Sequence, residues 1–252
     1  MAPAVPQPPR LFVLGNFELQ FDGEPLRVSA PAQRLLAYLA ISRRSRPVRR
    51  TAVAERLWSE TAPDRAASNL RSVLWRLPRP RGRQLVVSDA AAVRLSPDTE
   101  VDLWQAETVV ETVCGAVPPP GESLSALAVL CEDLLPDWHD DWLLIERESH
   151  RQKRLHALER ASAHLRERGE FNASLSAALS AVHCEPLRES AHRRVIEVHL
   201  AEGNHADALR QFESYRHLVA RELGLSPSPA MRELVAPLVG RPVDARRVRR
   251  AS

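Results

Sequence analysis

Hydrophobic positions near the start of the chain alternate as they do in a β-strand. Residues 11–21 are rich in strand-forming side chains. Four apolar residues occupy odd-numbered positions, which would place them on one face of a strand, toward the core: Leu11, Val13, Phe17 and Leu19. Asp22-Gly23 is a tight-turn dipeptide, and residues 26–28 return as a second run. The pattern predicts one strand at residues 11–21, a turn, and a second strand that completes a hairpin.

Helical spacing replaces this alternation further along the chain. A first helix is expected to begin at residues 29–31, where a proline suits the first turn. A second helix is expected at residues 50–58 and a third at residues 64–77, directly before a proline. Residues 84–88 and 93–96 then predict a short second hairpin.

The third predicted helix has one apolar face and one polar face. The apolar residues cluster on one side of a helical wheel: Ala66, Leu70, Val73, Leu74 and Leu77. The other side and its margins carry groups that hydrogen-bond base edges and phosphates: Arg65, Ser68, Asn69, Arg71, Ser72 and Arg76. Taken alone, the pattern favours an ordinary amphipathic surface helix. However, a strand pair, three helices and a hairpin follow the order of a winged helix-turn-helix, whose third helix lies in the major groove.

The second half of the chain predicts helices only. Between residues 141 and 238, Gly169 and Gly203 are 34 residues apart, and Leu175 and Leu209 keep the same offset. A period of 34 residues is typical of tetratricopeptide helix pairs, which stack into a concave protein-binding surface. The alternative is a helical bundle that only packs against the first domain.

The net charge of +3 conceals a strongly uneven distribution. Residues 27–83 carry 14 arginines and three acidic residues, a local charge of +11, whereas residues 100–150 carry 12 acidic residues and one arginine, a local charge of −11. Residues 241–252 carry five arginines and one acidic residue. Positive segments of this kind concentrate polyanions, chiefly nucleic acid. Basic surface alone is a weak signal, and a DNA partner also requires an element that reads the bases.

The sequence contains no recognisable motif for catalysis, metal binding or cofactor binding. The only lysine, Lys153, has no glycine-rich loop beside it, which excludes the usual phosphate-binding loop of nucleotide hydrolases. The three cysteines have no metal-ligand spacing, and the Asp-rich segment at residues 138–141 fits a helix start better than a metal site. The longest apolar run has seven residues, where a membrane-spanning helix needs about 20. The sequence therefore predicts no enzyme, no metal, no cofactor and no membrane contact, and a cytoplasmic location.

Several stretches together resemble a known family more specifically than any single motif. They are residues 33–40, 54–58, 69–77, 135–142, 185–192, 208–215 and 223–229. On these residues the chain resembles the SARP family, actinomycete activators of antibiotic pathways. The resemblance implies an α+β N-terminal winged helix-turn-helix followed by an all-α, tetratricopeptide-like bacterial transcriptional activator domain. The implied boundaries are a disordered tail at 1–10, the winged helix at 11–98, the activator domain at 99–240 and a basic disordered tail at 241–252.

The resemblance also implies a function and a set of site residues. The family binds direct repeats in promoters and recruits RNA polymerase, so the expected partners are double-stranded DNA, RNA polymerase and a second protomer on the DNA. Arg65, Asn69, Arg71, Ser72 and Arg76 match recognition-helix positions, with Ser68 on the same face, and Arg94 matches the wing arginine. Further arginines are expected to contact phosphates: Arg43, Arg44, Arg46, Arg49 and Arg50.

The expected function is therefore a sequence-specific, DNA-binding transcriptional regulator, most simply an activator associated with the bacterial nucleoid when bound. One departure supports an alternative, because Ala92-Val93 stand where the family wing has Gly-Tyr. The alternative is a tetratricopeptide-type adaptor whose basic module binds DNA without sequence preference or has lost DNA binding.

Overall fold

A computed structural model describes residues 7–44, 46–115 and 127–239. These residues form two compact units. The first unit contains residues up to 111 together with 128–152, and the second contains the remainder, chiefly residues 153–239. The predicted basic tail at 241–252 and most of the predicted N-terminal tail lie outside the described residues.

A four-stranded sheet opens the first unit. Its strands are β1 (Arg10–Phe12), β2 (Glu18–Phe21), β3 (Glu24–Pro25) and β7 (Glu100–Val101), in the order β3-β2-β1-β7. β1 and β2 are antiparallel, with Leu11 opposite Leu19, whereas β7 runs parallel to β1. The Asp22-Gly23 turn is confirmed, because both residues have positive φ angles of 51° and 81°.

The first predicted strand is wrong in one respect, because residues 11–21 form two strands rather than one. Gly15 has a φ of 72°, and its backbone N–H donates to the carbonyl oxygen of Asp133 at 2.7 Å. The chain reverses there, so β1 and β2 pair with each other. The second predicted strand at 26–28 is also wrong, because β3 ends at Pro25. Alternating apolar residues do not reveal such a break, since it depends on a partner far along the chain.

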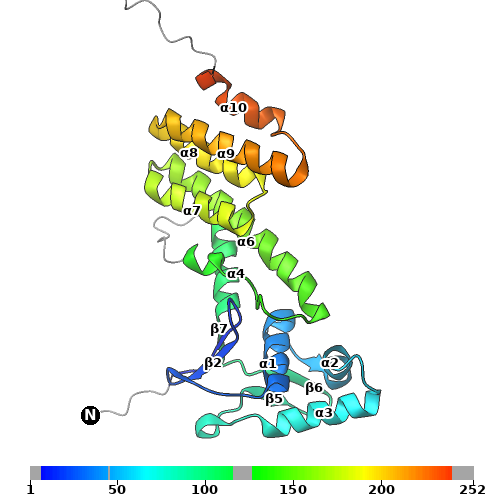
Figure 1. Cartoon of the computed structure of the whole chain (residues 1–252). Coiled ribbons are helices and arrows are strands. Elements are labelled where there is room, and N and C mark those ends of the chain that lie inside the picture. Colours follow the sequence, from blue (N-terminus) through cyan, green and yellow to red (C-terminus); the bar gives the residue numbers. More distant parts are fainter. Residues whose placement is uncertain (1–6, 45, 116–126, 240–252) are drawn as a thin grey trace, which may run out of the picture. The chain divides into compact units, whose positions relative to one another are not determined.

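Three helices and a second sheet complete this part of the first unit (Figure 1). The helices are α1 (Ala30–Arg43), α2 (Arg50–Leu57) and α3 (Pro63–Arg76), each close to its predicted bounds. After the short 3-10 helix at Pro80–Gly82, β5 (Val86–Ser88) and β6 (Ala92–Leu95) form the predicted hairpin. A two-residue strand, β4 (Val48–Arg49), pairs with β6, so the order is β4-β6-β5.

The core of the first unit lies between these helices and the second sheet. Leu35, Leu36 and Leu39 of α1 are fully buried, as are Val53 of α2 and Leu70 of α3. Buried residues of the sheet complete this core: Val48, Leu85, Val86, Val93 and Leu95. The hydrophobic positions of α1, α2 and α3 therefore face a single interior, as their periodicity predicts.

The acidic segment packs against α1 within the same unit. It contains α4 (Asp102–Cys114), the 3-10 helix at Val129–Cys131 and the start of α6 (Asp141–Glu167). The indole N–H of Trp104 donates to the carbonyl oxygen of Ala40 at 2.9 Å. The guanidinium of Arg34 donates to Asp140 Oδ1 at 2.9 Å, and the ring of Trp142 meets that of Tyr38 edge-on at 5.3 Å.

Asp102 ties α4 to the N-terminal sheet. Its carboxylate accepts hydrogen bonds from the backbone N–H groups of Val13, Leu14 and Leu103, at 2.7 to 3.1 Å. Burial raises the pKa of Asp102 above its ordinary value, although the backbone hydrogen bonds work in the opposite direction. Asp102 therefore stabilises this junction through its hydrogen bonds and not through ion pairing.

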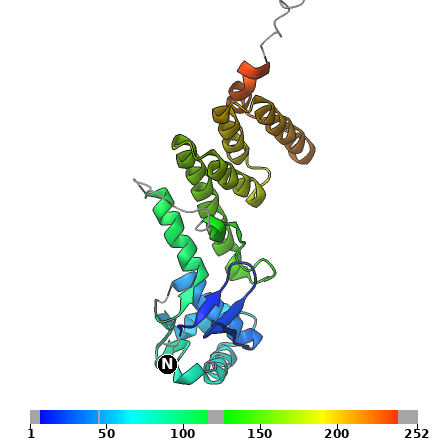
Figure 2. The ribbon, with the colours of Figure 1, turned by 90° about the vertical axis from the view of Figure 1, so that its left-hand side faces the viewer.

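The second unit consists of stacked helices, as the sequence predicts (Figures 1 and 2). After α6 come α7 (Phe171–Cys184), α8 (Glu189–Glu202), α9 (His205–Leu223) and α10 (Pro229–Val239). Gly169 and Gly203, 34 residues apart, follow α6 and α8 with positive φ angles of 76° and 79°. The repeat in the sequence thus corresponds to a repeated helix ending. Across the described part of the chain, no helix is long and apolar enough to cross a membrane.

His192 is a buried polar group in this unit. Its side chain, only 4% exposed, places Nε2 2.8 Å from the carbonyl oxygen of Pro186 and Nδ1 2.8 Å from the side-chain nitrogen of Gln211. The ring also lies 4.5 Å from that of Tyr215. Burial lowers the pKa of His192 below its ordinary value, and the hydrogen bond to Pro186 offsets only part of this effect.

We expect acid to destabilise the second unit through His192. The unfolded chain takes up a proton near pH 6.5, whereas the folded imidazole stays neutral to lower pH, so unfolding becomes more favourable as pH falls below about 6.5. Thermal unfolding followed by circular dichroism should show a smaller loss of melting temperature between about pH 7 and pH 5 in His192→Gln than in the wild type. Parallel pH profiles for the two proteins would contradict this role.

Candidate nucleic-acid interface

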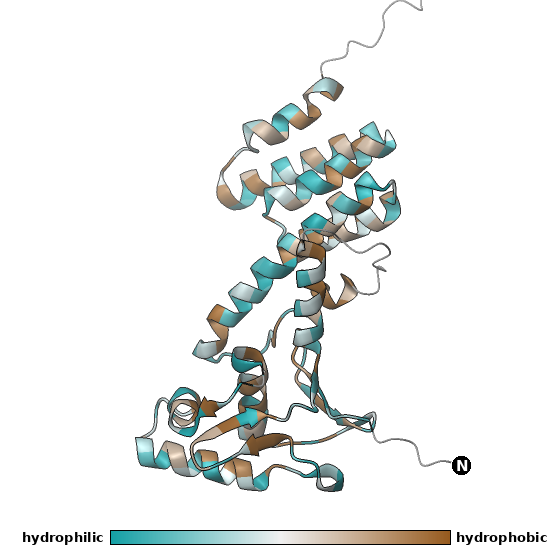
Figure 3. Ribbon diagram, turned by 180° about the vertical axis from the view of Figure 1, so that it is seen from behind, coloured by the Kyte–Doolittle hydropathy of each residue, from teal (hydrophilic) through white to brown (hydrophobic). Residues whose placement is uncertain are grey.

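One side of α3 holds the helix to the first unit and the other side faces solvent. Ala66, Leu70 and Val73 are buried, and Pro63 and Asp64 occupy the first turn, where each suits a helix start. The polar residues lie outward: Arg65, Ser68, Arg71, Ser72 and Arg76 are exposed, and Asn69 is half-buried. In Figure 3 the α3 ribbon shows hydrophilic and hydrophobic positions in alternation, as this division requires.

The outward face of α3 carries unpaired positive charge. Among the described residues, no acidic side chain forms an ion pair with Arg65, Arg71 or Arg76. The nearest acidic residue in sequence, Asp64, lies in the first turn, where it complements the helix dipole. These guanidinium groups are therefore available to a negatively charged partner.

Trp75 is a functional candidate that the sequence-based reasoning missed. Its side chain is 84% exposed, which is unusual for an aromatic residue of this size. At 100° per residue it falls between Arg71 and Ser68 on the polar face, so the helical wheel contained the signal. An exposed indole among arginines offers an apolar surface to a ligand whose charge the arginines bind.

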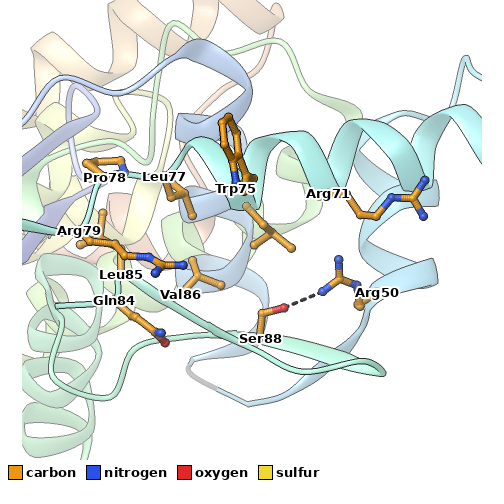
Figure 4. Close-up of a pocket in the computed structure, with 11 residues that line it drawn as sticks. Arg50, Arg71, Trp75, Leu77, Pro78, Arg79, Gln84, Leu85, Val86 and Ser88 are labelled. Carbon is orange, nitrogen blue, oxygen red and sulfur yellow. Dashed lines mark hydrogen bonds between the residues drawn. The ribbon is translucent and has the colours of Figure 1, made fainter. Parts of the chain in front are cut away.

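A groove of about 270 Å³ runs between the C-terminal half of α3 and the β5–β6 hairpin. Leucines and Val86 line its apolar part, and Arg50, Arg71, Arg79 and Gln84 supply its polar groups. Figure 4 shows Arg50 and Arg71 at one end of the groove and Arg79 and Gln84 at the other. The groove therefore presents positive charge at both ends.

Arg50 is positioned by the hairpin. Its Nη1 donates to Ser88 Oγ at 2.6 Å and to the carbonyl oxygen of Asp89 at 3.1 Å, and its backbone N–H donates to Ala91 at 3.0 Å (Figure 4). Backbone N–H groups of Ala92 and Ala91, together with Arg50, hold the pKa of Asp89 below its usual range. Asp89 is therefore ionised at neutral pH, and the turn carries a negative charge beside Arg50.

The remaining predicted arginines do not join this groove. Arg44 forms ion pairs with Glu107 and Glu111 of α4, at 3.6 and 3.9 Å. Arg43 lines a separate hollow with Tyr38, Glu55, Arg56, Trp142 and Glu146, and Arg46 is exposed in the connection to β4. The five arginines between residues 43 and 50 therefore do not form one surface. Arg50 lines the groove, and the other four lie outside it.

Arg94 and Arg49 lie on the outer face of the second sheet. Arg94 is paired in register with Val87, and its neighbours Val93 and Leu95 point into the core. Because successive side chains alternate between faces, Arg94 points away from that core, and the register of β4 puts Arg49 on the same outer face. No group of three or more potential metal ligands exists within the described ranges.

Comparison with known proteins shows which regulators the chain is similar to. Residues 121–238 match the model of the bacterial transcriptional activator domain. The regulatory protein AfsR of Streptomyces coelicolor is 28% identical over 243 residues, which is 89% of this chain and 24% of AfsR. The transcriptional regulatory protein EmbR of Mycobacterium tuberculosis is 23% identical over 253 residues, which is 93% of this chain and 64% of EmbR. The chain is therefore similar to these regulators and matches the bacterial transcriptional activator domain over its second half.

The fold of this chain is also found in a solved structure. Mycobacterium tuberculosis EmbR, in complex with a low-affinity phosphopeptide, matches with a TM-score of 0.66 and 22% identity, over 94% of this chain and 67% of that one. This likeness shows the fold alone. The chain spans about a quarter of the length of the AfsR proteins it matches. The resemblance expected from the sequence is therefore confirmed as similarity to these regulators, together with a small β region followed by helices.

The exposure of Trp75 leads to a spectroscopic prediction. The other four tryptophans are half-buried or buried, so Trp75 should dominate the fluorescence that acrylamide quenches readily. We expect Trp75→Phe to remove most of this quenchable fraction without changing the circular dichroism spectrum. Trp104→Phe is the matched control, and an equal loss in both variants would contradict the exposed position of Trp75.

Proposed function

We propose that residues 11–98, within the first unit, form a winged helix-turn-helix that binds DNA sequence-specifically. In this assignment α2 and α3 form the helix-turn-helix, α3 lies in the major groove, and the β5–β6 hairpin is the wing. The observation that carries the proposal is the outward face of α3, which is exposed and rich in arginine without acidic partners among the described residues. The regulators to which the chain is similar support the same role.

The proposed contacts with DNA are of two kinds: some side chains read the bases, and others bind the sugar-phosphate backbone and so position the protein. Arginine pairs bidentately with guanine and asparagine with adenine, so Arg65, Arg76 and Asn69 are candidates for base edges. Trp75 adds an apolar surface that fits a thymine methyl group. Arg50, Arg71 and Arg79 line the groove beside the hairpin, which suits the sugar-phosphate backbone next to the helix.

The proposed biological role is transcriptional activation in the cytoplasm. The first unit binds promoter repeats, and the activator domain contacts RNA polymerase or a second protomer on the DNA. The proposed boundaries remain 11–98 for the winged helix and 99–240 for the activator domain. No catalytic centre, metal or cofactor is part of this proposal.

One observation favours the adaptor as a second candidate. The turn of the proposed wing carries ionised Asp89, and Arg94 lies on the outer face of the sheet and outside the groove. A carboxylate at this turn repels a phosphate, which would weaken a wing contact. An adaptor with non-specific or lost DNA binding would tolerate that arrangement.

A competition gel shift distinguishes the two candidates. The regulator should be displaced from its own promoter fragment by the same unlabelled fragment far better than by a scrambled one. If about six phosphates are neutralised, log affinity should fall with log salt at a slope of roughly −5. Equal competition by both fragments would favour the adaptor, and binding that is independent of salt would contradict DNA binding through arginines.

Arg76→Ala tests base reading by α3. If Arg76 contacts a guanine bidentately, its loss should cost about 1–3 kcal/mol on the promoter and relax the preference at one base pair. The matched control is Arg210→Ala, an exposed arginine of α9 in the second unit. Equal losses of affinity on promoter and scrambled DNA would make Arg76 a phosphate contact.

A further inference from the structure

The second unit places three guanidinium groups around one carboxylate. Glu197 Oε2 accepts hydrogen bonds from Arg166 Nη1 at 2.7 Å and from Arg194 Nη1 at 2.8 Å. Arg193 Nε lies 3.8 Å from Glu197 Oε1. Arg166 comes from α6 and the other residues from α8, so the cluster joins two helices of the stack (Figure 1).

This arginine cluster, Arg166, Arg193, Arg194 and Glu197, is not electrically balanced. Within the described part of the chain, no second acidic side chain forms an ion pair with any of its arginines. Three positive charges thus meet one negative charge, and the Glu197 side chain is only 18% exposed. Like charges held a few ångströms apart and partly out of water repel each other, so a further anion would stabilise the arrangement.

Hydrogen-bond donors without acceptors also favour binding of an anion by the cluster. The Nε atoms of Arg193 and Arg194 are buried and have no hydrogen-bond acceptor in the structure. A buried N–H group without an acceptor is costly, and its cost disappears when a ligand supplies the acceptor. The three arginine side chains are 26 to 41% exposed, so a ligand can reach the cluster.

The chemistry of the cluster favours carboxylates as the ligand. A guanidinium presents a planar fork of donors that matches a carboxylate. Glu197 shows that a carboxylate fits among these arginines, since it accepts one hydrogen bond each from Arg166 and Arg194. Phosphate sites commonly use the free N–H groups of a helix N-terminus, whereas residues 193–197 lie in the interior of α8, where those groups are bonded within the helix. Recognition here would rest on side chains alone.

We propose that the arginine cluster on α6 and α8 is a docking site for an acidic peptide segment of a partner protein. The partner supplies one or two carboxylates that balance the excess positive charge. The site belongs to the second unit and uses none of the groove residues of the first unit. It therefore stands apart from the proposed DNA contact, and either function can fail without the other.

Fluorescence anisotropy with a labelled hexaglutamate peptide tests the site in the full chain, with hexaglutamine as the uncharged probe. Arg194→Gln should weaken hexaglutamate binding about ten-fold, the effect of losing one charge-assisted hydrogen bond. Glu197→Gln should tighten binding, because it leaves three guanidiniums without their internal carboxylate. A purely structural cluster would give the opposite result for Glu197→Gln, namely lower helicity and no gain in affinity.

Two further variants show which surface of the protein binds hexaglutamate. Arg210→Gln alters an exposed ion pair of α9 in the same unit and should leave hexaglutamate affinity unchanged. Arg71→Gln alters the outward face of α3 and reports any hexaglutamate that binds there instead. Equal weakening by Arg194→Gln and Arg210→Gln would overturn the proposal, as would weakening only by Arg71→Gln. If inorganic phosphate displaced hexaglutamate at an equal concentration of negative charge, the site would bind small anions in general, and the proposal of an acidic peptide would be wrong.

Discussion

The burial of one edge of α3 is the constraint on which the candidate interface depends. Leu70 is fully buried together with Ala66 and Val73, which fixes how the helix is rotated about its own axis. A buried leucine of this kind stabilises a fold by about 2–5 kcal/mol relative to alanine. Because the apolar edge can face only the core, the arginines and Trp75 must face outward.

The acidic segment has its own binding partners in the first unit, which keeps its charge away from α3. Asp140 pairs with Arg34, and Glu107 and Glu111 pair with Arg44, so these acids are matched to α1 and its end. Asp102 is held by backbone N–H groups. The opposite charges of residues 27–83 and 100–150 therefore do not simply neutralise each other. The pairing is selective, and it leaves the guanidiniums of α3 unmatched by any described acidic side chain.

The two units use arginine in different ways. On α3 the guanidiniums extend into solvent from a single helix, which suits a long polyanion that can slide along it. On α6 and α8 they converge on one carboxylate and are partly buried, which suits a small number of well-placed acidic groups. Burial and convergence, more than the number of arginines, distinguish the two surfaces.

The sequence determined the features that are local along the chain. It predicted α3 within a residue of its observed bounds, because proline and helical periodicity act over a few neighbours. It also predicted the polar face of α3 and the 34-residue repeat that includes Gly169 and Gly203, which the structure places at helix ends. Tertiary structure decided the rest: β4 and β7 have two residues each and form only because distant strands pair with them. Likewise, Arg44 and Arg50 are both expected to contact phosphates, yet one pairs with α4 and the other with the hairpin. An arginine's partner depends on which residues the fold brings within about 4 Å, and a linear pattern carries no such distance.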